Sequence, residues 1–147
     1  MSPDRALPVW ARITGRILRA AVYALGIVVG LADLNAPSPV ILDAVQPPWM
    51  HMWAWIATTA GVVGLLAVAA WRWRWEYVAS AALGLALAAR AIGVWSTVDE
   101  SAVRVAAAAS ITIAALACLL RTLDLTVFAI RTSAAVIHTR GGVRLRA

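Results

Sequence analysis

Four long apolar runs, separated by short polar stretches, dominate the sequence. The clearest run extends from Trp49 to Trp71 and contains no Asp, Glu, Lys or Arg. As a helix rising about 1.5 Å per residue, such a run covers the roughly 30 Å hydrocarbon core of a bilayer. The pattern therefore predicts an all-α integral membrane protein, a bundle of four transmembrane helices. The predicted spans are residues 13–34, 49–71, 76–95 and 103–120.

Tryptophans cluster at both ends of the second run, and another closes the third run. Indole combines an apolar body with one N–H group that needs a polar partner, so it is favoured at the headgroup layers. We therefore predict a set of interfacial anchors: Trp49, Trp53, Trp55, Trp71, Trp73, Trp75 and Trp95.

Helical periodicity continues beyond the fourth run. One side of that continuation carries the apolar residues Leu123, Val127, Ile130, Ala134 and Ile137. A helix over residues 103–138 would be about 54 Å long, well beyond the bilayer core. We predict that residues 121–147 form an amphipathic inner helix, which ends at Gly141 and Gly142 and leaves a basic tail that attaches to anionic lipid.

Composition agrees with a single membrane domain, because the chain is 63% hydrophobic and only 14% charged. Its net charge of +6 comes from thirteen arginines. Basic residues near short loops stay on the cytoplasmic side. The N-terminal segment, the turn with Arg72 and Arg74 and the C-terminal tail are basic, whereas the other two loops are acidic. We therefore predict a bacterial cytoplasmic (inner) membrane protein with both termini in the cytoplasm.

Small residues recur at helical spacing in the first and fourth runs. Gly26 and Gly30 form a GxxxG pair, and Ala106, Ser110 and Ala114 recur every four residues. Small side chains let helix backbones approach closely in a membrane. We predict helix packing at these positions, either between copies of the chain in a homo-oligomer or with helices of other membrane proteins.

Charged residues within the spans require separate explanations, because an ionised side chain in hydrocarbon is costly. Arg90 lies about 7.5 Å along a helix from Trp95. Its side chain could reach the outer headgroups, or it could pair with Asp33, Asp99 or Glu100. On the inner side, local pairs of Arg72 with Glu76 and of Arg121 with Asp124 would account for the charges.

The sequence contains no recognisable catalytic or metal-binding motif: HExxH, CxxC, GxSxG and a phosphate-binding glycine loop are all absent. His51 and His138 fall on opposite sides of the predicted membrane, and Cys118 lies within a span. We expect no enzymatic activity and no cofactor or metal. The basic tip is too short to predict nucleic-acid binding, so the expected partners are the lipid bilayer and other membrane helices.

In architecture, the chain resembles the holin-like membrane proteins encoded near the lysins of actinobacterial phages. The features that carry this resemblance are four spans, short loops, a basic tail and a composition rich in Arg, Ala and Trp. It implies an inner-membrane protein that accumulates, oligomerises and permeabilises the membrane during host cell lysis. The residues leave two alternatives open: a non-catalytic accessory subunit of a larger membrane complex, and a small channel or transporter. Small multidrug transporters place a glutamate in the middle of their first helix. The first apolar run of this chain has no such glutamate.

Overall fold

The computed structural model describes residues 8–36, 47–96 and 102–144 of the chain. Within these residues the chain is helical apart from the segment ends and one short turn. The helices are α1 (Val9–Asn35), α3 (Pro47–Ala69), α4 (Trp73–Trp95) and α5 (Ala102–Arg144). Each is long and apolar enough to cross a membrane. The prediction of four helices of transmembrane type is therefore confirmed.

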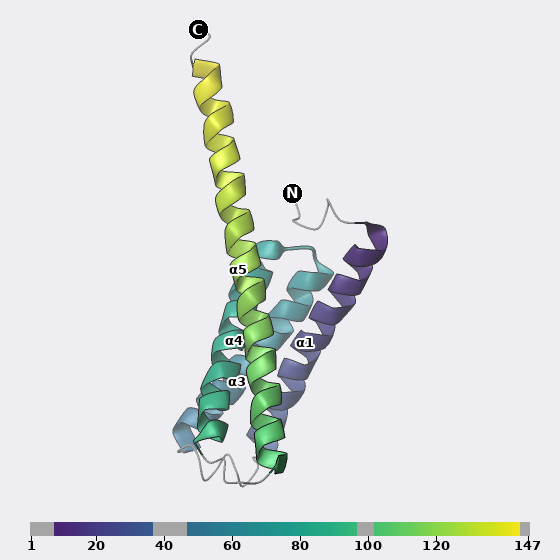
Figure 1. The fold of residues 1–147 in the computed structure, drawn as a ribbon, viewed down its shortest axis with the longest axis vertical. Coiled ribbons are helices and arrows are strands. Elements are labelled where there is room, and N and C mark those ends of the chain that lie inside the picture. The colour runs from purple at the N-terminus through teal and green to yellow at the C-terminus, as the bar shows by residue number, and fades with distance from the viewer. Residues whose placement is uncertain (1–7, 37–46, 97–101, 145–147) are drawn as a thin grey trace.

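Consecutive helices pack side by side and alternate in direction (Figure 1). Helix α3 packs along α1, α4 along α3, and α5 along α4. As a result, α1 and α4 run parallel to each other. At one end of the molecule α1 begins, α3 turns into α4, and α5 leaves the bundle (Figure 1). We call this end the terminal end.

The buried core consists mainly of small side chains, with Tyr23, Leu83, Leu87 and Val68 as its larger members. Tyr23 of α1 is 3% exposed, and Leu83 of α4 is fully buried. The alanines packed with them are Ala57, Ala60, Ala79, Ala86 and Ala115. Because lipid tails are as apolar as leucine, close packing of this kind is a main source of helix association in a bilayer.

The turn between α3 and α4 is fixed by a backbone motif and by one arginine of α1. Trp71 adopts a left-handed conformation with φ of 56°, and the Arg72 N–H bonds the Ala67 carbonyl at 3.0 Å, as in a Schellman motif. Arg16 donates to the Ala69 carbonyl at 2.9 Å and lies 4.4 Å from the centre of the Trp71 ring. This turn ends α3 before residue 71, so Trp73 and Trp75 belong to α4.

Helix α5 is continuous and extends past the terminal end (Figure 1). Its apolar part runs from Val105 to Ser133, longer than the predicted span of 103–120. The prediction that the helix ends at Gly141 is wrong, because it is helical through Arg144. An amphipathic role for residues 121–147 at the membrane surface stays a prediction.

Candidate functional site: the charged seam between α1 and α4

A buried carboxylate joins three helices near the terminal end. Glu76, in the first turn of α4, has a side chain only 7% exposed. Its Oε1 atom accepts a hydrogen bond from Arg121 Nε of α5 at 3.0 Å and lies 3.5 Å from Arg19 Nε of α1. A carboxylate in a low-dielectric interior needs such cationic partners to stay ionised. We call these three residues the Glu76 cluster.

The cluster corrects the sequence-based pairing of charges on this side. The expected pairs were Arg72 with Glu76 and Arg121 with Asp124. Instead, Glu76 and Arg121 bind each other, and Arg72 and Asp124 are exposed. The physical reason is that Glu76 points into the bundle, where Arg19 and Arg121 approach from neighbouring helices. A search limited to neighbours on one helix could not find pairs between helices.

Hydroxyl groups line the interior next to the cluster. Tyr23 donates to the backbone carbonyl of Glu76 at 3.4 Å. The hydroxyls of Ser80 and Thr122 lie 3.0 Å apart and share a hydrogen bond between α4 and α5. Ser80 is 1% exposed. These bonds give the buried polar groups of three helices partners inside the chain, which limits the cost of burying them.

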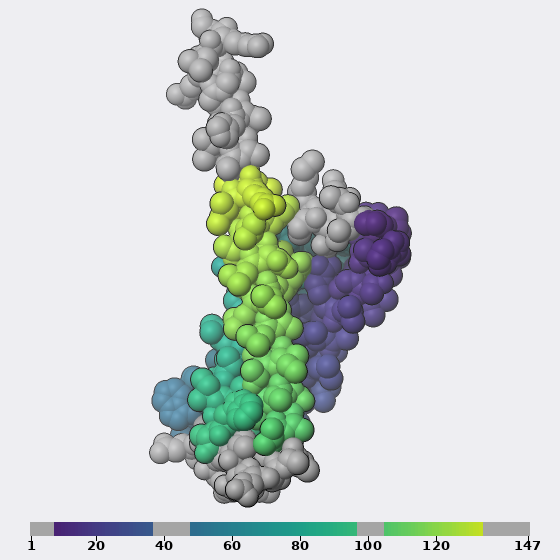
Figure 2. Space-filling model, in the orientation of Figure 1, coloured from purple at the N-terminus to yellow at the C-terminus, as the bar shows by residue number. Residues whose placement is uncertain are grey.

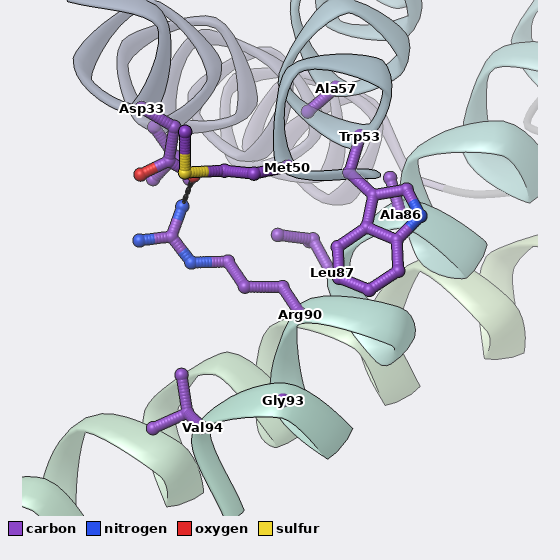
Figure 3. Close-up of a pocket in the computed structure, with 10 residues that line it drawn as sticks. Asp33, Met50, Trp53, Ala57, Ala86, Leu87, Arg90, Gly93 and Val94 are labelled. Carbon is purple, nitrogen blue, oxygen red and sulfur yellow. Dashed lines mark hydrogen bonds and ion pairs between the residues drawn. The ribbon is translucent and has the colours of Figure 1, made fainter. Parts of the chain in front are cut away.

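At the opposite end of α1 and α4, Asp33 of α1 forms an ion pair with Arg90 of α4. Figure 3 shows the Arg90 side chain extending across the gap between the helices to Asp33, beside Met50. The pair borders a cavity of about 20 Å³ that Met50 and Trp53 of α3 also line. Within the described residues, Arg90 Nε is buried without a hydrogen-bond partner, and the cavity has room for about one water.

This pair decides between the two explanations given for Arg90. The Arg90 side chain binds Asp33 and is 20% exposed. It does not extend away from the helices toward the position expected for the headgroups. Asp99 and Glu100, the other expected partners, lie outside the described residues.

The two charged sites belong to one repeating pattern along the parallel helices α1 and α4. Arg19 pairs with Glu76, Gly26 packs against Leu83, and Asp33 pairs with Arg90. Each pair lies seven residues from the next on both helices, the repeat of left-handed helix pairing. The outer pairs are about 21 Å apart along the axis, within the thickness of a bilayer core. We call these three pairs the α1–α4 seam.

The signs of the charges give the seam a single register. Helix α1 places its arginine first and its aspartate second, whereas α4 places its glutamate first and its arginine second. Any shift of α4 along α1 separates both pairs at once, and each separation leaves buried charges without partners. Such separations are strongly unfavourable, so the charges specify alignment as well as association.

Gly26 and Gly30 are both covered within one chain, Gly26 by the side chain of Leu83 and Gly30 by the backbone and Thr58 of α3. A Cβ atom on Gly26 would lie 2.9 Å from a methyl carbon of Leu83. On Gly30 it would lie 2.2 Å from Thr58 Oγ1 and 2.7 Å from the Ala54 carbonyl oxygen of α3. The expectation that copies associate through these glycines is therefore corrected, because α3 and α4 already cover them.

The small-residue ridge of α5 lies largely on the surface. Ala106 and Ser110 are exposed, and Ala114 is half-buried. The residues of α5 that face the bundle are Ala108, Ala115, Cys118 and Leu125. Contact of the ridge with another chain stays a prediction.

The predicted tryptophan anchors lie near the helix ends and divide into two groups. Five are about half exposed: Trp49, Trp55, Trp71, Trp75 and Trp95. The other two are partly buried. Trp53 lines the cavity beside Asp33, and Trp73 makes an edge contact with Phe128 at 5.6 Å. Placement of the exposed indoles at a bilayer surface stays a prediction.

The Glu76 cluster and its hydroxyl neighbours were not predicted from the sequence. The available signal was the seven-residue spacing from Arg19 to Asp33 through Gly26, matched by the spacing from Glu76 to Arg90 through Leu83. Among the described residues, no group of three His, Cys, Asp or Glu side chains could hold a metal ion. Comparison with protein-family models, curated proteins and solved structures gave no match.

Proposed function

We propose that this chain is a holin-like membrane protein, whose copies associate through α5 and permeabilise the bacterial cytoplasmic membrane. The observation that carries the proposal is an apolar row on the outer face of α5. Its members are Ile113, Leu116, Leu120, Leu123, Val127 and Ile130, between 47% and 67% exposed. We call this row the α5 stripe.

The spacing of the α5 stripe favours another helix as its partner. Its members alternate between three and four residues apart, the spacing at which side chains of one helix insert between those of a parallel neighbour. In Figure 2, α5 lies at the front of the molecule with this part of its length uncovered. A second copy presents the same stripe, so a symmetric pair of α5 helices buries both.

The length of α5 supports assembly of copies beyond the bundle as well. Phe128 contacts Trp73 at the start of α4, and α5 continues from there to Arg144. That continuation corresponds to about 24 Å of helix. Two α5 helices that pair along their whole length make a longer contact than two that pair only along the part within the bundle.

The α1–α4 seam supports the permeabilising step. A water-filled lesion needs polar groups along its wall, because hydrocarbon and water do not mix. The seam and its partner Arg121 hold five charged side chains inside an otherwise apolar bundle. A rearrangement among associated copies that separates α1 from α4 would turn these groups toward water.

Expression of the chain in a bacterial host, with membrane potential followed by a dye, tests the proposal. We expect the wild type to abolish the potential once it accumulates. A variant with Leu116→Ala and Leu123→Ala should need several-fold more protein to do so. The matched control carries Leu25→Ala and Leu85→Ala, which remove equally exposed leucines (63% and 64%) from α1 and α4, and it should behave like the wild type. Normal potential at high wild-type expression would reject the proposal.

A non-catalytic accessory subunit is the second candidate, and the projecting part of α5 favours it. A helix that extends past its own bundle can pack along a helix of another protein. Cross-linking separates the two functions. Wild-type chains that stay monomeric in the membrane and leave the potential intact would favour the accessory subunit.

A further inference from the structure

Two cavities lie along the α1–α4 seam, one on each side of its middle pair. The Ser80 cavity is a cleft of about 160 Å³ next to the Glu76 cluster, and Ser80 is one of the residues that line it. The Arg90 cavity is the one of about 20 Å³ beside Asp33 and Arg90. We propose that the two cavities belong to one water path through a single chain, and that the side chain of Leu83 closes this path.

Both cavities offer polar partners to water. Tyr23 and Arg121 also line the Ser80 cavity, whose volume has room for several waters. The Arg90 cavity has room for about one water, and Arg90 Nε has no hydrogen-bond partner among the described residues. Cavities of sufficient volume that contain polar groups hold water, whereas purely apolar cavities stay dry. We therefore expect water on both sides of the middle of the seam.

A short apolar barrier separates the two cavities. Ser80 lines the first cavity and Leu87 lines the second. The interval of seven residues between them on α4 corresponds to about 10.5 Å of helix. This is about one third of the roughly 30 Å hydrocarbon core of a bilayer. Leu83 lies near the middle of the interval and is fully buried.

Leu83 closes the barrier because its neighbours are small. Gly26 on α1 has no side chain, and a Cβ atom there would lie 2.9 Å from a methyl carbon of Leu83. The other buried residues of this core are mostly alanines, which are too short to take the place of a leucine side chain. An apolar constriction of this kind excludes water by dewetting. Removal of the Leu83 side chain, or its replacement by a polar one, should therefore join the two cavities.

The charges at the cavities indicate what such a path would carry. Arg121 lies at one cavity and Arg90 at the other. Arginine charges along a path oppose the passage of cations, whereas uncharged water is not repelled. The path lies within one chain and needs no association of copies, so it is distinct from the lesion proposed above.

Vesicles that contain the purified full chain and self-quenched carboxyfluorescein test the proposal. An osmotic step with sucrose makes the vesicles shrink, and the quenching of the dye follows their volume. We expect wild-type vesicles to shrink at the rate of protein-free vesicles, and vesicles with Leu83→Ala to shrink several-fold faster. Equal rates for Leu83→Ala and the wild type, or fast shrinkage with the wild type itself, would overturn the proposal. Vesicles with lesions lose the dye and give no volume signal, so the proposed lesion and the path are measured separately.

A matched control removes an equally buried leucine away from the path. Leu125 is 0% exposed, like Leu83, and lies on α5 one turn beyond Arg121 toward the terminal end, outside the interval between the cavities. Vesicles with Leu125→Ala should shrink like those with the wild type. An equal acceleration by Leu125→Ala and Leu83→Ala would show that any core defect lets water through, and would overturn the proposal.

Two further variants test the closure itself. The three atoms nearest to a Cβ on Gly26 all belong to Leu83. Gly26→Val combined with Leu83→Ala keeps the same number of side-chain carbons at this contact and should restore the slow rate. Leu83→Asn keeps a side chain of similar size but makes it polar, so it should accelerate shrinkage without a large cavity, and it serves as the test if Leu83→Ala does not fold. A fast rate for the double variant, or a slow rate for folded Leu83→Asn, would contradict closure by Leu83. Titration of mixed micelles with sodium dodecyl sulfate checks that each variant is folded.

Discussion

The α1–α4 seam and the α5 stripe both repeat with seven-residue periodicity, yet they differ in chemistry and in exposure. The seam joins charged pairs inside one chain, whereas the stripe presents apolar side chains on the outside. Separation of a buried charge pair costs several kcal/mol. Separation of two apolar helices in lipid costs much less, since the tails replace the lost contacts. The comparison teaches that the seam fixes the fold of each chain, while the stripe permits association that depends on concentration.

The largest effect should come from Glu76→Gln. This change removes the buried carboxylate that pairs with Arg121 and Arg19, and loss of one partner of a buried pair costs about 3–5 kcal/mol. We expect a decrease of about that size in the free energy of unfolding, measured by titration of mixed micelles with sodium dodecyl sulfate. A decrease below about 1 kcal/mol would show that the Glu76 cluster does not hold the helices together.

A slightly smaller effect should follow from exchange of charges at the other end of the seam. Asp33→Arg alone and Arg90→Asp alone each place two like charges together, and each should destabilise the bundle by about 3 kcal/mol. The double variant restores an ion pair with reversed polarity and should recover most of the lost stability. Additive losses in the double variant would contradict direct pairing between α1 and α4.

The stripe should respond in the opposite way. Leu116→Ala with Leu123→Ala should change the free energy of unfolding of the single chain by less than about 0.5 kcal/mol, because exposed sites contribute little. The same variant should reduce disulfide cross-linking between copies that carry Leu120→Cys in a Cys118→Ala background. A large loss of stability with unchanged cross-linking would assign the stripe to the fold and not to association.

The last effect concerns the backbone of Trp71, which is left-handed, a conformation that glycine adopts without strain. Trp71→Gly and Trp71→Ala both remove the indole and its contact with Arg16. The alanine variant keeps the steric cost of the left-handed conformation, so it should be less stable by about 1 kcal/mol. Equal stability of the two variants, measured in the same micelle titration, would show that the turn relaxes after loss of the indole.

The number of helices was predictable from the sequence, because an apolar run long enough to cross a membrane is compatible with few structures other than a helix. The end of the fourth span at residue 120 stays a prediction. Arg121 and Asp124 suggested the end of the apolar segment, but Glu76 pairs with Arg121, so this charge is compatible with continuation of the helix. The sequence around Arg121 could not show this, because its partner Glu76 lies on another helix.

The candidate site was predictable only in part. Asp33 was considered as one of several partners for Arg90, but Glu76 was assigned to Arg72 on its own helix. Gly26 and Gly30 were expected to allow close approach of another helix. Their partners, Leu83 and Ala54 with Thr58, follow from the order in which helices pack, which periodicity alone does not provide.

The pairing of Asp33 with Arg90 also sets an order for biosynthesis. These residues are 57 positions apart in the chain, so at roughly 5–20 residues per second the ribosome completes α4 several seconds after α1. Until then, Asp33 lacks its partner Arg90, and an ionised side chain without a partner opposes entry of a helix into hydrocarbon. In a bilayer, helix α1 would therefore gain its full stability only on the arrival of α4, and insertion of the chain would be a cooperative event between its first and third helices.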